Sequence, residues 1–267
     1  MNYKIAPTYY TRLLRVKAHA KPGDVLLNAG CGTGEYNFYL RNKFRQSYGV
    51  DINQEDIATA RSINTDDSIH YDVGDVANLT FSNGYFDTII CVDVLEHVED
   101  PAQVVKELWR VLKPGGQMVA TIPHKNYPFF YDPVNFLMER WFDKHFPIGI
   151  WGFGHTFLFD RMMLRGVLED AGFSVQKTEG LTHSFCGFLE CYIPTILQPL
   201  FKSNAKNKPA VETKRSKERF WRFNYKIPRL FAAILETLIR IDYALGKNSR
   251  RSVGLLMTAV KPTDETE

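Results

Sequence analysis

Alternation of strand-like and helix-like segments over the first 182 residues most constrains how this chain can fold. Short apolar runs are followed by stretches with helix signals, such as 100–116, which has Asp100 as a cap and Pro101 at the first helical position. With short links, this alternation predicts a doubly wound, mostly parallel α/β sheet with helices on both faces. Ligands of such sheets bind outside the carboxyl ends of the strands.

The last apolar run indicates how the chain is divided. We expect residues 251–262 to return into the sheet as its last strand, beside the strand predicted at 173–181. Residues 182–250 would then be a helical insertion before that strand, and residues 1–181 plus 251–262 would form the core. A disordered tail is expected at 263–267. The other strands are predicted at 24–30, 46–52, 68–76, 85–95 and 117–123, and helices at 33–44, after Asn53, at 100–116 and at 160–173.

Positive charge is concentrated in the predicted insertion. Residues 182–252 carry 14 Lys and Arg against 5 Asp and Glu, whereas the remainder carries 19 against 25. The basic run 202–226 lies between an apolar segment, 185–201, and an amphipathic one, 228–246. This pattern favours contact of 185–246 with an anionic membrane surface, and the alternative is a helical cap packed on the core. Nucleic acid is not expected as a partner, because the chain shows no recognition module.

Other features exclude several protein classes. No apolar run approaches the roughly 20 uncharged residues of a spanning helix, and the N-terminus lacks the apolar region of a secretory signal. The four cysteines form no CxxC pair and no zinc-type cluster, so free thiols and no metal are expected. The resulting interpretation is a cytoplasmic protein that can lie peripherally on the inner membrane face.

Three glycines after the first predicted strand indicate a ligand site. Gly30, Gly32 and Gly34 leave the backbone bare where a helix begins, so a ligand can touch main-chain atoms there. Asp51, at the end of the second strand, can accept hydrogen bonds from both ribose hydroxyls of a nucleotide cofactor, and Asp75 can accept one from an adenine amino group. The alternative for both aspartates is a surface turn or cap. The G-C-G-T-G spacing departs from the dinucleotide fingerprint, which disfavours a nicotinamide-dependent oxidoreductase, and no P-loop lysine follows.

Six segments follow one another along the chain: "LLNAGCGTGEY", "GVDIN", "VGDVANLTF", "FDTIICVDVLEHVEDP", "VLKPGGQMVATIP" and "FDRMMLRGVLEDAGF". In this order and spacing they resemble the class I S-adenosylmethionine-dependent methyltransferases, and most closely the type 11 group that includes ubiquinone and menaquinone biosynthesis enzymes. The resemblance covers roughly residues 7–181 and the last strand. It implies a seven-stranded sheet whose last strand runs antiparallel between the fifth and sixth.

The resemblance also implies roles for individual residues. Gly30, Gly32 and Gly34 would line the methionine part of S-adenosylmethionine, and Asp93 would lie near its sulfonium. Asp51 would hold the ribose, Asp75 and Val76 would meet the adenine, and Ile52 would be a further cofactor-binding residue. Asn28 stands where the family usually has Asp or Glu. It keeps the hydrogen-bonding shape of the carboxylate but lacks the charge that favours the cofactor's ammonium group.

Two histidines are candidate catalytic residues. His97 follows the fourth predicted strand, in a loop that faces the methyl end of the cofactor in the family, so it can take a proton from an acceptor or hold it. His155 lies where related enzymes often have a polar residue facing the substrate cavity. The alternatives are a structural histidine at a helix start and a turn histidine. Aromatic residues are dense between Tyr127 and Phe153, which predicts either a lid around a large apolar acceptor or a helical core.

Together these observations predict a methyltransferase that methylates oxygen or carbon of a bulky apolar or lipid-like small molecule, at the membrane surface. A second hypothesis is a non-catalytic binding module that keeps the fold and joins a complex through its insertion.

Overall fold

The structure is a computed structural model that describes residues 7–147, 149–183, 186–187, 229–246 and 249–263. Most of the predicted insertion lies outside the described residues, including all of the apolar run 185–201 except 186–187 and the whole basic run 202–226, as does the predicted tail beyond 263. The helices are α1 (Pro7–His19), α2 (Glu35–Leu40), η1 (Arg41–Lys43), α3 (Gln54–Ile63), α4 (Pro101–Val111), α5 (Pro133–Phe142), η2 (Gly149–Phe153), α6 (Arg161–Asp170) and α9 (Arg229–Gly246). The strands are β1 (Gly23–Ala29), β2 (Phe44–Asp51), β3 (Ile69–Val73), β4 (Phe86–Val92), β5 (Leu112–Pro123), β6 (Ser174–Leu181) and β7 (Gly254–Val260).

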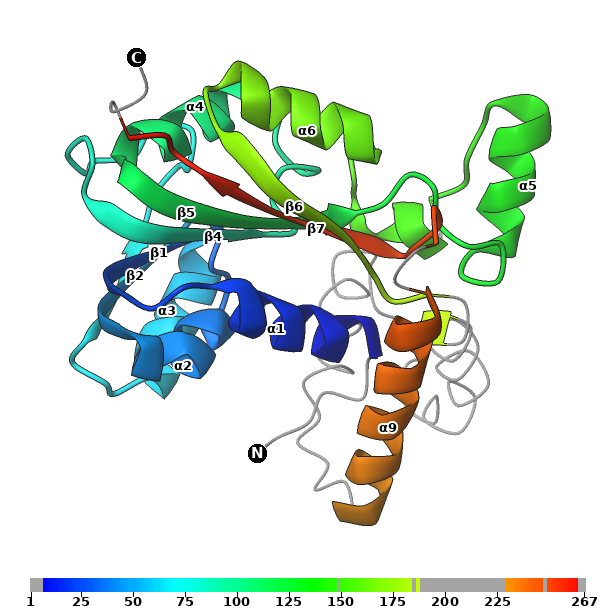
Figure 1. The fold of residues 1–267 in the computed structure, drawn as a ribbon, viewed down its shortest axis with the longest axis horizontal. Coiled ribbons are helices and arrows are strands. Elements are labelled where there is room, and N and C mark those ends of the chain that lie inside the picture. Colours follow the sequence, from blue (N-terminus) through cyan, green and yellow to red (C-terminus); the bar gives the residue numbers. More distant parts are fainter. Residues whose placement is uncertain (1–6, 148, 184–185, 188–228, 247–248, 264–267) are drawn as a thin grey trace, which may run out of the picture. The chain divides into compact units, whose positions relative to one another are not determined.

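The strands form one seven-stranded sheet in the order β3-β2-β1-β4-β5-β7-β6. The pairs β1–β2, β1–β4, β2–β3 and β4–β5 are parallel. Lys261, just after β7, exchanges backbone hydrogen bonds with Gly115 and Gly116 near the start of β5, so β7 runs antiparallel to β5. The predicted mostly parallel sheet, with the last strand between the fifth and sixth, is therefore confirmed. Figure 1 shows α4 and α6 together over one face of this sheet and α2 and α3 over the other.

The core forms where β4 and α4 bury their apolar side chains. Ile89 and Ile90 on β4 are fully buried, as expected for a strand at the sheet centre with helices on both faces. On α4, Val104 and Leu108 are four residues apart and so share the buried stripe. Asp100 caps this helix by accepting a hydrogen bond from the Gln103 N–H at 3.0 Å, which confirms the predicted helix start.

Several predicted boundaries were wrong. The helix predicted over 100–116 ends at Val111, because β5 already begins at Leu112 and not at 117. The helix predicted over 33–44 is only α2 followed by the single 3₁₀ turn η1, because Gly34 has a left-handed φ of 76° and Phe44 already begins β2. The strand predicted to reach residue 95 ends at Val92, because Asp93 has φ 55°. The third strand ends at Val73 instead of 76. Helix α1 was not predicted.

The chain divides into two compact units that do not follow the sequence order. One consists of Met1–Arg12, Asn126–Phe153 and Gly180–Gly254, and the other of Leu13–Lys125, Gly154–Glu179 and Leu255–Glu267. The second unit contains most of the sheet with α2, α3, α4 and α6. In the first unit, Asp242 of α9 accepts hydrogen bonds from the backbone N–H groups of His183 and Cys186, so this helix is tied to the segment that follows β6.

A buried carboxylate on β6 leads to a prediction about acid stability. Burial alone would raise the pKa of Glu179, but hydrogen bonds from His19, Arg15 and Lys177 outweigh it and hold the pKa well below its ordinary value of 4.5. This contribution to stability is present above about pH 4.5 and is lost as the pH falls below it. We expect Glu179→Gln to lower the free energy of unfolding by about 2 kcal/mol at pH 7. The loss is limited to this size because Arg15 and Lys177, which lose their charged partner, still reach solvent. Urea unfolding at pH 7, 5 and 3 should show the difference from wild type shrinking, and a difference independent of pH would contradict the prediction.

Candidate active site

The turn after β1 combines three left-handed glycines with different surroundings. Gly30, Gly32 and Gly34 have φ values of 70°, 51° and 76°. A Cβ at Gly30 would lie 2.2 Å from a Val94 methyl, and one at Gly34 would lie 2.3 Å from the Tyr71 hydroxyl oxygen. A Cβ at Gly32 would meet no atom within 4 Å. Gly30 and Gly34 are thus required by packing as well as by conformation, whereas Gly32 presents bare backbone to open space.

The structure brings Asp51 against this turn. Its Oδ2 accepts a hydrogen bond from the Gly32 N–H at 2.7 Å, and its Oδ1 accepts one from the Asn53 N–H at 2.9 Å. Each carboxylate oxygen has a second lone pair, so the side chain can also accept hydrogen bonds from a ligand's hydroxyl groups. Ile52, the next residue, is 75% exposed although its side chain is apolar. The carboxyl ends of β1 and β2 therefore present a carboxylate, an apolar side chain and bare backbone in one place.

Asp75 and Val76 follow β3, and the side chain of the first is exposed whereas that of the second is buried. Asp75 is exposed, and its Oδ1 accepts a hydrogen bond from the Ala77 N–H at 2.8 Å, as in a turn. Val76 is buried, and its side chain belongs to the main hydrophobic core. Any contact that Val76 makes with a ligand is therefore expected through its main chain.

Asn28 is buried in a row of neutral polar groups that crosses β1, α2 and β2. Its Nδ2 donates to Asn37 Oδ1 at 2.6 Å, and Asn37 Nδ2 donates to Ser47 Oγ at 2.8 Å. All three residues are at most 2% exposed. In this orientation of Asn37, a carboxylate at position 28 would place an oxygen against Asn37 Oδ1 with no proton between them, so the observed row is matched to an amide at position 28.

The loop after β4 begins with a strained residue. Asp93 has φ 55°, an uncommon conformation for a residue with a side chain, which costs free energy and clusters at functional sites. It is held by two hydrogen bonds with Thr121 of β5: the Asp93 N–H donates to the carbonyl oxygen at 2.9 Å, and Asp93 Oδ1 accepts from the hydroxyl at 3.2 Å. Strand β5 thus holds the start of the loop that leads to Glu96 and His97.

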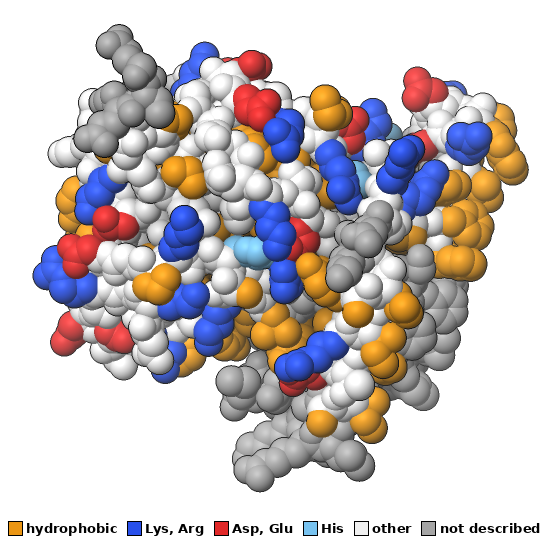
Figure 2. Space-filling model, viewed as in Figure 1, with side chains coloured by type: hydrophobic (Ala, Val, Ile, Leu, Met, Phe, Trp, Pro, Cys, Tyr) orange, Lys and Arg blue, Asp and Glu red, His pale blue; other side chains and the backbone are white. Residues whose placement is uncertain are grey.

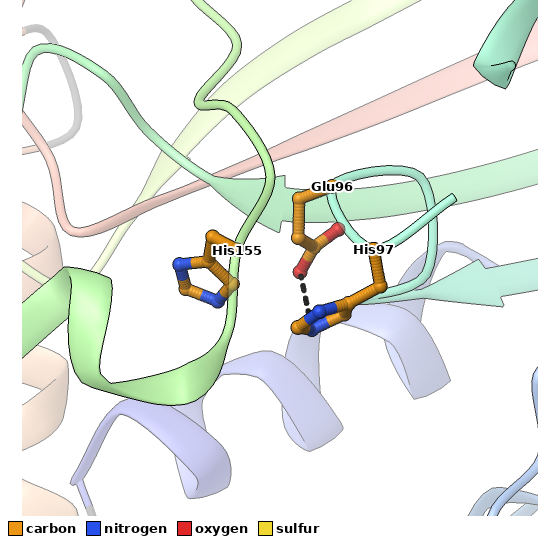
Figure 3. A group of neighbouring side chains, drawn as sticks. All are labelled: Glu96, His97 and His155. Atoms are coloured by element: carbon orange, nitrogen blue, oxygen red, sulfur yellow. Dashed lines mark ion pairs between the residues drawn. The ribbon is translucent and has the colours of Figure 1, made fainter. Parts of the chain in front are cut away.

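His97 and His155 lie together although 58 residues separate them. Their ring centroids are 5.0 Å apart, and His97 Nε2 lies 3.9 Å from Glu96 Oε1 (Figure 3). The His97 side chain is 38% exposed, whereas Glu96 is fully buried. The backbone joins the two segments, because Thr156 donates to the Glu96 carbonyl oxygen from both its N–H (2.9 Å) and its hydroxyl (2.8 Å). Sequence reasoning missed Glu96, whose only signal was its place beside His97.

This sheet order, with a glycine turn after β1 and a carboxylate at the end of β2, is the arrangement expected of a class I S-adenosylmethionine-dependent methyltransferase domain. Residues 27–120 match the family model described as "Methyltransferase domain", and the domain is a member of the type 11 group. The sequence resemblance to that group is thereby confirmed.

Known proteins with similar sequences carry the same kind of domain. The chain is 28% identical over 181 residues to "Phosphoethanolamine N-methyltransferase 1" of Zea mays, covering 65% of this chain and 33% of that protein. It is 25% identical over 177 residues to "Ubiquinone biosynthesis O-methyltransferase" of Pseudomonas paraeruginosa, covering 61% and 69%. The chain thus spans about one third of the length of the plant protein.

A solved structure shows the same fold. Phosphoethanolamine N-methyltransferase 2 of Haemonchus contortus, in complex with phosphomonomethylethanolamine and S-adenosylhomocysteine, superposes with a TM-score of 0.57. The sequences are 18% identical, and the match covers 94% of this chain and 52% of that one.

The cofactor of this domain is S-adenosylmethionine, and the observed turn fits it. Gly32 leaves space that a Cβ would fill, Asp51 supplies acceptor oxygens for ribose hydroxyls, and Ile52 offers an exposed apolar side chain to a flat base. When bound, the cofactor supplies a methyl group on a sulfonium, which is a good leaving group. The individual contacts assigned to these residues, and to Asp75, Val76, Asp93 and Asn28, remain predictions.

Proposed function

We propose that this chain is an active methyltransferase that transfers the methyl group to an oxygen of a bulky apolar acceptor held at a membrane surface. The alternative site of methylation is a carbon atom of the acceptor. The similarity to the Pseudomonas ubiquinone biosynthesis O-methyltransferase supports an oxygen acceptor on a quinone-like molecule, because this match covers 69% of that protein. The match to the plant phosphoethanolamine enzyme covers only 33% of its length and supports that acceptor less.

The observation that carries the proposal is an exposed apolar surface around α5, in the first compact unit. Six large apolar side chains between 39% and 67% exposed lie within 18 residues of sequence, and Figure 2 shows hydrophobic side chains along α5. We call them the α5 patch: Phe129, Phe130, Val134, Trp141, Phe142 and Phe146. Exposed Arg140 and Lys144 lie among them together with exposed Asp143, and apolar side chains beside a net positive charge suit an anionic lipid surface. Within the described ranges, no helix has the length and hydropathy that crossing a bilayer requires.

Methyl transfer from a sulfonium requires little of the protein beyond alignment of the acceptor atom, the methyl group and the sulfur. In the transfer, the S–CH₃ bond breaks as an O–CH₃ bond forms, S-adenosylhomocysteine leaves, and the acceptor hydroxyl loses its proton. We place His97 and His155 on the acceptor side, because the β4 loop that carries His97 lies at the carboxyl edge of the sheet, next to the turn after β1. Their role is to hold the acceptor oxygen and to favour loss of its proton.

Methyl transfer tests the proposal directly. The protein is incubated with S-adenosylmethionine labelled in its methyl group and anionic vesicles that contain a hydroxylated prenyl quinone, with soluble phosphoethanolamine as the competing acceptor. We expect label in the organic phase at a position that resists acid, as an aryl ether does. Label only in the phosphoethanolamine fraction would overturn the acceptor class, and label in neither fraction would contradict an active enzyme of either kind.

Membrane contact can be measured apart from turnover. We expect the double substitution Trp141→Ser and Phe142→Ser to reduce flotation with phosphatidylglycerol vesicles at least about tenfold, since both side chains are mostly exposed and each contributes on the order of 1 kcal/mol of apolar burial. The matched control is Phe38→Ser, another exposed aromatic residue outside the α5 patch. Equal binding of the double variant and the control would argue against the α5 patch as the contact surface.

A further inference from the structure

Glu96, His97 and His155 form a ligand set suited to a divalent metal ion. One carboxylate oxygen and one nitrogen from each imidazole all lie within 4.8 Å of one another. Ligand atoms of a tetrahedral zinc site are about 3.3 Å apart, given bonds of about 2.0–2.1 Å. Side-chain rotations that move these atoms by about 1.5 Å would therefore bring all three onto one ion. A carboxylate with two imidazoles is a set that zinc, iron and manganese use.

The hydrogen bond of His97 prepares one of its nitrogens for a metal. His97 Nδ1 lies 3.3 Å from the Gly154 carbonyl oxygen, and a carbonyl oxygen can only accept, so Nδ1 carries the proton. In the neutral ring, Nε2 then has its lone pair available, and Nε2 is the nitrogen that faces Glu96 in Figure 3. Metal-bound histidines commonly donate their other N–H to a backbone carbonyl in this way. The 3.9 Å between Nε2 and Oε1 is too long for a hydrogen bond and suits two ligands of one cation.

The two segments that carry the ligands are fixed to each other. Thr156 donates twice to the Glu96 carbonyl oxygen, so the turn at His155 is attached to the loop after β4 at the position next to the carboxylate. The exposed side of His97 leaves room for further ligands. Three protein ligands with open positions are typical of a catalytic metal site, whereas a structural site is closed by four.

We propose that Glu96, His97 and His155 bind one divalent transition-metal ion, with zinc as the reference ion, and that this ion coordinates the acceptor oxygen. Coordination would lower the pKa of the acceptor hydroxyl, so that its proton passes to water and the oxygen attacks the methyl carbon as an oxyanion. In this arrangement His97 is a ligand and does not itself take the proton. The binding of the ion stands on the three side chains alone, and only its effect on the acceptor rests on the proposed function.

Titration of the untagged, chelator-treated protein with Zn²⁺ tests the site without cofactor or acceptor. We expect one ion per chain, and absorption bands of a low-coordinate nitrogen–oxygen site when Co²⁺ replaces Zn²⁺. His155→Ala and His97→Ala should each weaken binding at least about 100-fold, because each removes one of three ligands. The matched control is His70→Ala, which replaces an exposed histidine of β3 whose ring packs at a tilt against Tyr48, and it should bind as the wild type does.

Two results would overturn the proposal: no saturable binding of Zn²⁺, Mn²⁺ or Fe²⁺ by the wild type, or affinities unchanged in both His97→Ala and His155→Ala. Titration of the same preparations with S-adenosylhomocysteine distinguishes a protein that lacks only the metal site from a protein that also lacks the cofactor site of the proposed function. A protein that binds S-adenosylhomocysteine and transfers methyl groups equally well with and without chelator would refute the action of the ion on the acceptor oxygen and leave the methyltransferase intact, whereas the binding of the ion is decided by the Zn²⁺ titration.

Discussion

Asp51→Ala is expected to lower the affinity for S-adenosylhomocysteine at least about 100-fold. The carboxylate stands at the end of β2 with both oxygens directed at backbone N–H groups of the cofactor-side turns. Two charge-assisted hydrogen bonds to ribose hydroxyls, at about 1.5 kcal/mol each, amount to about 3 kcal/mol, which corresponds to that factor. Loss of the bond to the Gly32 N–H also loosens the turn. Isothermal titration of the purified variant measures the change.

The control for this experiment is another aspartate, which lies at the amino ends of the strands and not at their carboxyl ends. Asp24 stands near the amino end of β1 and pairs with Arg45, both of them exposed, so Asp24→Ala should bind S-adenosylhomocysteine normally. Unchanged affinity in Asp51→Ala would contradict the assigned ribose contact. If the wild type itself binds neither S-adenosylmethionine nor S-adenosylhomocysteine, the non-catalytic binding module becomes the better hypothesis.

Alanine substitutions at Gly30 and Gly32 are expected to separate folding from binding. Gly30→Ala should destabilise the protein by about 2–4 kcal/mol, because a left-handed residue costs about 1 kcal/mol and its Cβ would overlap Val94. Gly32→Ala should cost only about 1 kcal/mol, because its Cβ meets nothing within 4 Å. It should nevertheless reduce cofactor affinity about tenfold or more, since the alanine side chain would occupy the open space beside the backbone of residue 32.

Thermal unfolding and titration of the same two proteins give both quantities. The informative result is a Gly32→Ala protein that melts within a few degrees of the wild type but binds poorly. If Gly32→Ala binds S-adenosylhomocysteine as the wild type does, the open side of the turn is not where the cofactor lies. A Gly30→Ala protein as stable as the wild type would show that Val94 can move aside at little cost.

The sheet was predictable because its signals are local. Apolar runs ended by glycine, the caps Asn53 and Asp100, and the order of strands and helices are all contained in short stretches of sequence. The last strand was harder, and the resemblance to a known family supplied its position and direction. The short α2 was missed because the left-handed Gly34 and an early β2 shorten a segment whose composition suits a longer helix.

The site was predictable only in part, since tertiary contacts decide what each residue presents. The pairing of Asp51 with the glycine turn follows from the adjacency of β1 and β2. The approach of His155 to His97 depends on how the chain returns after η2, which no local pattern encodes. The burial of Glu96 and of the Val76 side chain could not be predicted either, because both lie in loops whose composition is that of exposed turns.

The polar row through Asn28 makes this position epistatic. Restoring the acidic residue typical of the family would require the Asn37 amide to turn so that it donates to residue 28, and the Ser47 hydroxyl would then have to donate to Asn37 Oδ1 instead of accepting from Asn37 Nδ2. A single Asn28→Asp substitution therefore reports on the whole row and not on the charge alone. Because residues 28, 37 and 47 change their hydrogen bonds together, the effect of a substitution at any one of them is expected to depend on the other two.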